Sequence, residues 1–488
     1  MQKVKTRVIE LKWFSVCLKN AHISSAIIEA VCVTFAYSPQ VVMAFMHDRC
    51  AVNMASFRLT LAGVFPGADD NDCMPHTVMH VGEALAHPTL DELMGLYNTE
   101  NSHSNYFKQM MKKITGQMPL KKSGTRWWGE LDAVTKTVEP SLTDGKLLEV
   151  AEWLVANKHC EKSAGNMRDM LRDSRKLVFL KVEAAVQSTV GNCIKATGRV
   201  LEGDGYVQVS GYKELVKLKA QLHDPLTAPG LMDKLTAIAA AAPALPPPLP
   251  PTPFVAPAPV LALARGGPGR AAAAANVHAQ PPAPLPAAAA AAAPTLGPIM
   301  GYGDILARGD LQDVEVLKEL VRMAVVPAHN YCSTKIFGEC LQQVRRMEAA
   351  VSFNPLSVKA NGIGVSDVDR LAERYRFFDL VRFAGLAAKM KEELPSYLAA
   401  VAMIKPLNER LDEDDKDTFD IEAWWSVHLG DLRAWADALC AVLCHVPNSC
   451  PPERAFSILN DSIGDDQTSA LADYKKAMVM LQYNKRGR

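Results

Sequence analysis

The feature that most constrains this chain is a low-complexity tract near its middle, from about Ala237 to Gly303. Alanine and proline dominate the tract, which includes Pro246-Pro247-Pro248 and two alanine runs. It carries almost no charge and almost no large apolar side chain, so ordering it would bury too little surface to offset the lost conformational entropy. We therefore expect a disordered, partly polyproline linker, which serves as a spacer rather than as a ligand for an SH3-like or WW-like domain.

The linker divides a chain of 488 residues, long enough for two or three folding units. The 53 basic residues balance the 53 acidic ones, so any contact with nucleic acid must come from local patches. The 11 cysteines are odd in number and form no paired framework, and no signal peptide precedes them, which favours a reducing compartment. Proline interrupts the long apolar tract repeatedly, so we expect no membrane span.

Apolar residues recur with helical spacing on both sides of the linker. One stripe after residue 146 consists of Leu147, Val150, Ala151 and Leu154. Helical spacing resumes after the turn Gly203-Asp204-Gly205. Beyond the linker, we expect helices from Asp313, from Phe377 to Met403 with a break at Pro395, and from Leu432 to Leu443.

The amino-terminal part instead has the short apolar runs that predict strands. Arg7 to Leu18 is rich in β-branched and aromatic residues, and Val41 to Met46 is a continuous run typical of a buried strand. Asp48 follows that run directly, before a helical pattern at residues 51–61. A carboxylate at the carboxyl end of a buried strand is a common place for chemistry in α/β folds. By itself, however, Asp48 fits a helix cap better.

Near the other end of the chain, Glu453 and Arg454 follow the double proline Pro451-Pro452. The prolines end any preceding helix, and the second suits the first turn of a new one. The helix dipole favours a carboxylate in that turn, and Phe456 contributes to an apolar face. Without further context, this segment is an ordinary helix start.

Five segments taken together resemble sequence blocks of hAT-superfamily DNA transposases. In chain order they are Asp48 to Asn53, Cys73-Met74-Pro75-His76, Thr125-Arg126-Trp127, the pair Trp424-Trp425, and Glu453-Arg454-Ala455-Phe456-Ser457. Each fragment alone is a weak signal, and their common order makes the resemblance strong. The matches cover about 1–135 and 419–488 and leave the middle unmatched.

The resemblance implies an α/β plus α fold. A ribonuclease H-like mixed sheet core, truncated at its first strand, would begin in residues 1–135. A large all-α insertion, in two parts at 136–236 and 304–418, would interrupt this core and carry the disordered Ala/Pro linker at 237–303. Residues 419–488 would be the hAT carboxy-terminal dimerisation region, which completes the core and supports a homodimer or higher oligomer.

The resemblance also implies the roles of individual residues. Asp48 and Glu453 match the second and third catalytic acids, which hold Mg²⁺ in the family. Arg126 and Trp127 match a pair at the DNA end, where the tryptophan stacks near a flipped base, with Lys121 and Lys122 beside them for phosphate contact. The alternative is that Trp127 and Trp128 are core residues and that the basic run, which also holds Lys108, Lys112 and Lys113, is a solvated face; composition favours it.

The first catalytic acid should lie upstream of Asp48, where Glu10 and Glu29 are the acids present and neither fits. We therefore expect a catalytically inactive, transposase-derived nuclear protein that acts through dimerisation and DNA binding. One alternative is an active transposase or nuclease whose first strand lies outside this sequence. Another is a helical scaffold without a nucleic-acid partner, which requires a buried Trp127 and a wide separation of Asp48 from Glu453.

Two groups of cysteine and histidine residues have some likeness to zinc sites. They are Cys440, Cys444, His445 and Cys450, and Cys73, His76 and His80. Neither has the spacing of paired ligands that a structural zinc site requires. We predict no zinc, and Mg²⁺ only in an active enzyme.

Overall fold

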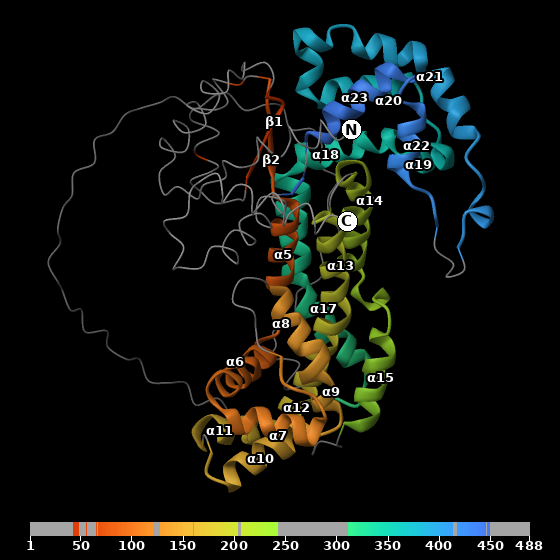
Figure 1. Ribbon diagram of the computed structural model, residues 1–488. Helices are drawn as coiled ribbons and strands as arrows, with labels where there is room; N and C mark the ends of the chain where they lie inside the picture. Colours follow the sequence, from red (N-terminus) through yellow and green to blue (C-terminus); the bar gives the residue numbers. More distant parts are fainter. Residues whose placement is uncertain are drawn as a thin grey trace, which may run out of the picture.

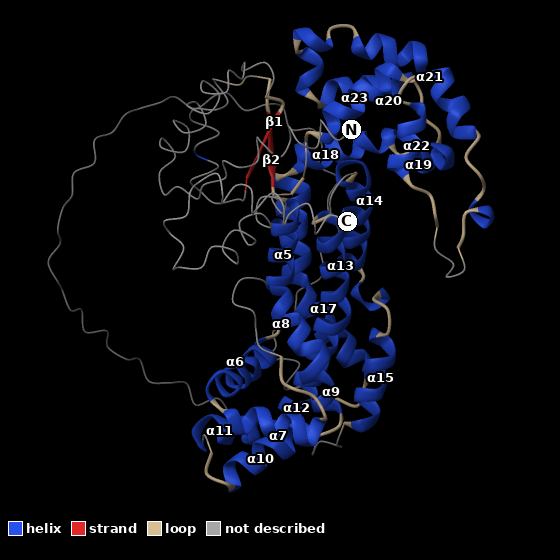
Figure 2. Ribbon diagram, viewed as in Figure 1, coloured by secondary structure: helices blue, strands red, loops and turns tan. Residues whose placement is uncertain are grey.

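The computed structural model describes residues 42–47, 55, 65, 67–120, 127–159, 161–203, 206–242, 311–412, 417–445 and 447–448. This part of the chain is mostly helical, with a single pair of strands (Figure 2). The helices form a central bundle, with a lower lobe at one end and an upper lobe at the other (Figure 1). Each of the three has its own cluster of buried apolar side chains.

The strands β1 (Ala44–His47) and β2 (Asp69–Asp72) run parallel, with Ala44 opposite Asp69 and His47 opposite Asp72. The strand expected at residues 41–46 is thus confirmed as β1. Its side chains are half-buried, whereas we expected a fully buried strand. Within the described residues, the sheet has these two strands alone, so it is too small to enclose β1.

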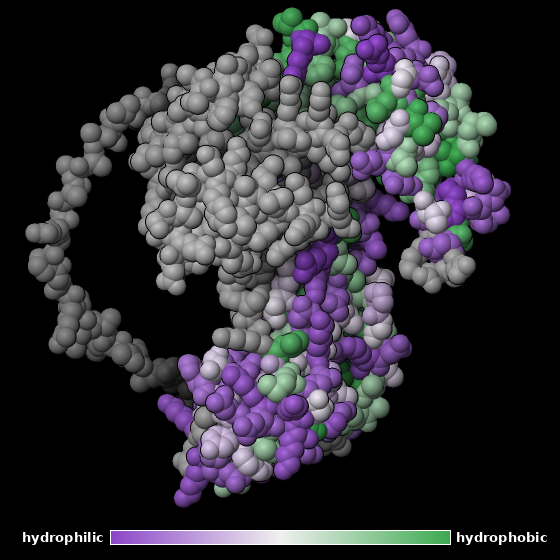
Figure 3. Space-filling model, viewed as in Figure 1, coloured by the Kyte–Doolittle hydropathy of each residue, from purple (hydrophilic) through white to green (hydrophobic). Residues whose placement is uncertain are grey.

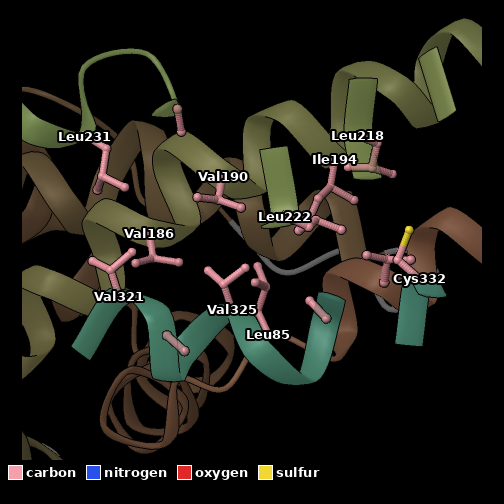
Figure 4. Close-up of a cluster of buried hydrophobic side chains, with 14 of the residues drawn as sticks. Leu85, Val186, Val190, Ile194, Leu218, Leu222, Leu231, Val321, Val325 and Cys332 are labelled. Carbon is pink, nitrogen blue, oxygen red and sulfur yellow. The ribbon is translucent and has the colours of Figure 1, made fainter. Parts of the chain in front are cut away.

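The central bundle follows the strands. Its helices are α5 (Met74–Glu83), α8 (Trp127–Ala133), α12 (Ser174–Val186), α13 (Asn192–Leu201), α14 (Val207–His223), α15 (Leu231–Ala241), α17 (Val314–Tyr331) and α18 (Leu341–Ala350). Single π-helical stretches, Gln187–Gly191 and Cys332–Glu339, continue α12 and α17. In Figure 4 the side chains of Val186 and Val190 point toward Val321 and Val325 in the core of this bundle.

The lower lobe contains α6 (Pro88–His103), α7 (Asn105–Thr115), a π-helical stretch (Val134–Val138), α9 (Glu139–Thr143), α10 (Lys146–Ala156) and α11 (Glu161–Arg172). The stripe predicted after residue 146 is confirmed, because all four of its apolar side chains are buried in α10. The buried carboxylate of Glu183 on α12 accepts a hydrogen bond from the backbone N–H of Leu90 at 2.6 Å. It thereby caps the free amides at the start of α6 and joins this lobe to the bundle.

The upper lobe contains α19 (Pro355–Asn361), α20 (Val365–Arg374), α21 (Leu386–Ala402), α22 (Ile421–His428) and α23 (Arg433–Leu443). Short 3₁₀ turns occur at Val351–Phe353, Arg376–Asp379, Val381–Phe383 and Leu407–Glu409, and a further one, Pro225–Thr227, lies in the central bundle. Aromatic rings fill the core, where the Tyr397 ring lies 4.4 Å from Trp435 and 5.5 Å from Trp425, measured between centroids.

Three further helix predictions are confirmed. Asp313 caps α17 by accepting from the N–H of Glu315 at 2.8 Å. The glycine turn at 203–205 separates α13 from α14. The helix expected at 432–443 is α23, with Trp435 and Leu439 both buried.

The predicted start of the linker at residue 237 is wrong, because α15 extends to Ala241. Alanine has the highest helix propensity, and the first proline of the tract is Pro243. Leu235 and Ala239 also pack into the bundle, which holds the alanine-rich stretch in place. Residues 243–310 lie outside the described part of the chain.

The helix predicted for residues 377–403 also differs from the structure. Two 3₁₀ turns occupy its first part, and α21 begins at Leu386. Pro395 lies inside α21 instead of ending it. Proline in a helix interior costs about 3 kcal/mol, and here Leu394 and Tyr397 are buried on either side of it, so packing outweighs that cost.

Candidate functional site

Most residues predicted to carry the chemistry lie outside the described part of the chain. They are Asp48, Asn53, Lys121, Lys122, Arg126, Glu453, Arg454, Phe456 and Ser457. Trp127 begins α8, but its side chain is also outside that part. The described site residues are Cys73, His76, Trp424 and Trp425.

The two chain segments that lead to the predicted acids meet at the amino terminus of α5. The N–H of Cys73 donates to the carbonyl of His47, which directly precedes Asp48, at 2.8 Å. The next amide, the N–H of Met74, donates to the carbonyl of Pro447 at 2.9 Å. Cys73 is the residue that caps α5, so the predicted Cys73-to-His76 block has a structural role where opposite ends of the chain meet.

Asn448 fixes the carboxy-terminal segment to a second helix. Its Nδ2 donates to the carbonyl of Leu201 at 2.8 Å and to that of Gly203 at 3.1 Å, at the end of α13. The last carbonyls of a helix have no partner within the helix, so the amide of Asn448 satisfies groups that burial would otherwise leave unpaired. Residues 447–448 therefore connect the start of α5 with the end of α13.

Three buried charged or titratable side chains lie beside this junction, and we call them the Asp69 cluster: Asp69, Arg346 and His445. They come from β2, from α18 and from the residue two positions after α23. Arg346 Nη1 lies 3.2 Å from Asp69 Oδ1, and His445 Nε2 lies 3.1 Å from Asp69 Oδ2. All three are at least 95% buried, so their mutual contacts replace solvation.

The Asp69 cluster has further hydrogen bonds. Arg346 Nη2 donates to Asn71 Oδ1 at 2.6 Å and to the carbonyl of Asp70 at 2.7 Å. The hydroxyl of Tyr375 donates to the carbonyl of Arg346 at 2.8 Å. These bonds orient the guanidinium toward β2 and tie the cluster to the upper lobe.

The environment of Asp69 holds its carboxyl group in the ionised form. Burial raises the pKa of Asp69, but the hydrogen bond with His445 and the charges of Arg346, His445 and Arg376 lower it by more. The net result is a pKa below the ordinary value. The sequence gave no sign of this pairing: His445 suggested a metal ligand, and Arg346 lies in an amphipathic helix.

Side chains of α18 also cover the free edge of β2. The side-chain amide of Gln343 accepts from the N–H of Asp72 and donates to its carbonyl, both at 2.8 Å. Gln343 thus takes the place that the backbone of a further strand would occupy.

On the opposite face of β2, His47 Nε2 lies 2.7 Å from Asp70 Oδ1. Cys340 Sγ donates to Asp72 Oδ2 at 3.2 Å. Strand alternation explains the division, since Asp69 and Asn71 point inward while Asp70 and Asp72 point the other way.

The cysteine and histidine groups weighed as zinc sites make other contacts. His80 pairs with Glu83 at 2.6 Å, and Cys444 Sγ donates to the carbonyl of Cys440 at 3.3 Å. Among the described residues, no group of three or more His, Cys, Asp or Glu side chains has the arrangement to hold a metal ion. Cys450 lies outside those residues.

The two tryptophan pairs of the sequence are more buried than their composition indicated. Trp425 is fully buried, and its Nε1 donates to the carbonyl of Phe353 at 2.9 Å, whereas Trp424 is half-buried. Trp128 is 3% exposed, and its Nε1 donates to Glu202 Oε1 at 3.3 Å. The interpretation of Trp128 as an exposed stacking residue is therefore wrong, and it is a core residue as the alternative predicted.

The lysines of α7 lie on a solvated face. Lys112 and Lys113 are exposed, while Phe107 and Met111 on the other face are fully buried. This arrangement fits the alternative interpretation of the basic run, and it also leaves those charges accessible to an anionic partner.

The packing of Trp128 gives a direct prediction. A Cβ added at Gly198 on α13 would lie 2.6 Å from Cζ2 of Trp128. We expect Gly198→Ala to lower the free energy of unfolding by about 1–3 kcal/mol, because overpacking outweighs the better helix propensity of alanine. Urea denaturation checks this, with Gly165→Ala on α11 as the control, since a Cβ there meets no atom within 4 Å. Equal stability of both variants would contradict the observed packing.

Within the described residues, we find no helix with the length and apolar character that crossing a membrane requires. Comparison of this chain with protein-family models and with curated proteins finds no match.

Proposed function

We propose that this chain is an hAT-transposase-like protein that acts through dimerisation and DNA binding on a ribonuclease H-like core. The observation that carries the proposal is the junction at the amino terminus of α5. There, the adjacent amides of Cys73 and Met74 bind the carbonyls of His47 and Pro447, which come from opposite ends of the chain. The proposed family fold requires this long-range closure, because its catalytic carboxylates belong to an early strand and to the carboxy-terminal block.

Chain length limits how far the two predicted acids can lie from this junction. Asp48 follows His47 directly, and Glu453 follows Pro447 by six positions. An extended chain spans at most about 3.5 Å per residue, so Glu453 lies within roughly 21 Å of the carbonyl of Pro447. This bound supports the proposal, since two carboxylates that share metal ions must come within a few ångströms of each other.

The parallel strands and the helical insertion support the same assignment. In the proposal, β1 and β2 belong to the sheet of the core, and α18 belongs to the insertion that returns to cover its edge. The exposed Lys112 and Lys113 on α7 provide positive charge for contact with DNA phosphates.

DNA binding is tested by fluorescence anisotropy with labelled duplex and hairpin-ended DNA, with and without Mg²⁺. We expect binding that weakens steeply as salt concentration rises, because phosphate contacts release counterions. No binding at low salt would contradict the proposal. Cleavage that depends on Mg²⁺ and is lost in Asp48→Asn and Glu453→Gln would instead favour the active transposase.

Dimerisation is tested by light scattering on the full chain. In the proposed dimerisation region, Val427 on α22 is 76% exposed, which leaves an apolar group available for a second copy. We expect a wild-type dimer and a shift of Val427→Asp toward the monomer mass of 53.1 kDa. Val381→Asp is the matched control, since Val381 is 80% exposed in the same lobe but outside that region. A monomeric wild type would remove this part of the proposal.

A helical scaffold without a nucleic-acid partner is the second candidate, and the burial of Trp128 favours it. It predicts a monomer and no salt-dependent DNA binding. The anisotropy and light-scattering measurements therefore separate it from the first proposal.

A further inference from the structure

Three aromatic rings form a stack on the lower lobe: Tyr106 from α7, Trp153 from α10, and His159 from the turn before α11. The rings of Tyr106 and His159 lie 3.7 Å apart between centroids and are inclined by only 10°. Those of His159 and Trp153 lie 5.7 Å apart and are inclined by 29°. Tyr106 is 50% exposed, so the stack ends at an accessible ring.

The local sequence positions His159 through the cap that ends α10. The N–H of His159 donates to the carbonyl of Leu154 at 2.8 Å, and that of Lys158 donates to the carbonyl of Val155 at 3.1 Å. These two bonds define a Schellman motif, in which the residue after the left-handed position packs back on the last turns of the helix. The motif therefore places the His159 ring on Trp153.

The left-handed position of this motif is occupied by Lys158, with φ 57°. In the described part of the chain, every other residue with positive φ is a glycine. Glycine adopts this conformation without the clash between Cβ and the backbone, so a lysine here is strained. Strained residues that persist often have a function, and the feature that lysine adds is a flexible positive charge beside the stack.

Other positive charges lie near the same stack. Lys158 is exposed and directly precedes His159, and the exposed Lys162 follows in the first turn of α11. The exposed Lys113 is seven positions after Tyr106 on α7, which places both on one face of the helix. The visible surface of this lobe is largely hydrophilic (Figure 3). A cationic or apolar ligand suits this surface poorly, whereas a flat ring that carries a phosphate suits it well.

We infer that Tyr106 is a stacking platform for an unpaired base of single-stranded DNA, whose phosphates lie against Lys158 and Lys162. A base that stacks on the free face of Tyr106 extends the three-ring stack by one. Stacking on an aromatic side chain accepts any base, so we expect little sequence preference. The inference rests on the proposed DNA binding and adds a site on the lower lobe, distinct from the predicted Arg126-Trp127 pair.

The first test uses fluorescence anisotropy of a labelled oligothymidylate with the full chain. We expect Tyr106→Ala to weaken binding roughly 5- to 150-fold, the range that corresponds to one base–aromatic stack. Tyr106→Phe keeps the ring and should bind within about twofold of the wild type. Thermal denaturation of each variant verifies that the fold is intact. Equal affinity of Tyr106→Ala and the wild type would overturn the inference.

The second test uses the strain at Lys158, because its two possible roles predict different results. We expect Lys158→Gly to leave Tm unchanged or raise it, since glycine relieves the strained φ. The same variant should bind oligothymidylate more weakly, with a salt slope reduced by about 0.7, the value for one phosphate contact on a single strand. Lys389→Gln removes an exposed charge on α21 and should change neither quantity. A lysine that serves the turn alone would leave both affinity and slope unchanged in Lys158→Gly, which overturns the inference.

Wild-type controls separate this inference from the proposed function. Binding to duplex DNA without binding to oligothymidylate overturns the inference and leaves the proposed function standing. Absence of binding to either DNA overturns both.

Discussion

Arg346→Met is expected to lower the free energy of unfolding by about 3–5 kcal/mol. The substitution keeps most of the side-chain volume but leaves the buried Asp69 carboxylate without its guanidinium partner, which lies 3.2 Å away in the wild type. It also removes the donors to Asn71 and to the carbonyl of Asp70. Breaking a buried pair in this way is costly because the remaining charge stays desolvated.

Guanidinium chloride denaturation measures the effect, and the preceding residue supplies the control. Arg345 lies on the same helix and is only half-buried, and its replacement by methionine is expected to cost less than about 1 kcal/mol. If Arg346→Met were no less stable than Arg345→Met, the Asp69 cluster would not hold β2, α18 and the carboxy-terminal segment together.

The pH dependence of stability gives the sign of the Asp69 contribution. The pKa of Asp69 is lower in the folded chain than its ordinary value, which applies to the unfolded chain. Its stabilising contribution is therefore fully present above the unfolded pKa and is lost as pH falls through the folded pKa. We expect the stability difference between the wild type and Asp69→Asn to shrink over that acidic range. A difference that grew on acidification would contradict this linkage.

Trp425→Ala is expected to lower the free energy of unfolding by about 3–5 kcal/mol, the usual range for removing a large buried aromatic side chain. Trp425 is fully buried against Tyr397 and Phe353, and its Nε1 donates to a backbone carbonyl at 2.9 Å. The substitution leaves a large cavity and an unpaired buried acceptor.

The adjacent Trp424 is the matched control, because it is the same residue type on the same helix. It is half-buried, and its ring contacts Trp425 edge-to-face at 5.0 Å. We expect Trp424→Ala to cost clearly less than Trp425→Ala in the same denaturation measurement. Equal losses would show that both rings contribute similarly to the core of the upper lobe. The comparison also bears on truncation: a chain ending before Asp420 would lose Trp425 and Trp435 from that core, so surface substitution is the cleaner test of dimerisation.

Features that depend on neighbours in sequence were predictable. The stripe of α10, the cap of α17 by Asp313 and the strand before His47 all follow from patterns within a few residues. Errors occurred where packing opposes local preference. Pro395 continues inside α21 because its neighbours are buried, and the alanines after residue 237 remain helical because Leu235 and Ala239 pack into the bundle.

The candidate site was predictable only in its outline. The Cys73-to-His76 block and the approach to Glu453 were recognised as separate fragments, and their meeting at the start of α5 required the structure. No local pattern pairs Asp69 with Arg346 and His445, because each comes from a different segment and each has an ordinary role in its own. The stack of Tyr106 on His159 was missed for the same reason.

The amino-acid sequence by itself determined where the helices and the strand β1 lie, since periodicity, capping and turn residues act over a few positions. Tertiary structure alone decided which tryptophan of each pair is buried, which carboxylate is paired and which segments meet at α5. Those choices depend on desolvation and on charge–charge distance between segments that are remote along the chain, and a linear pattern contains neither quantity.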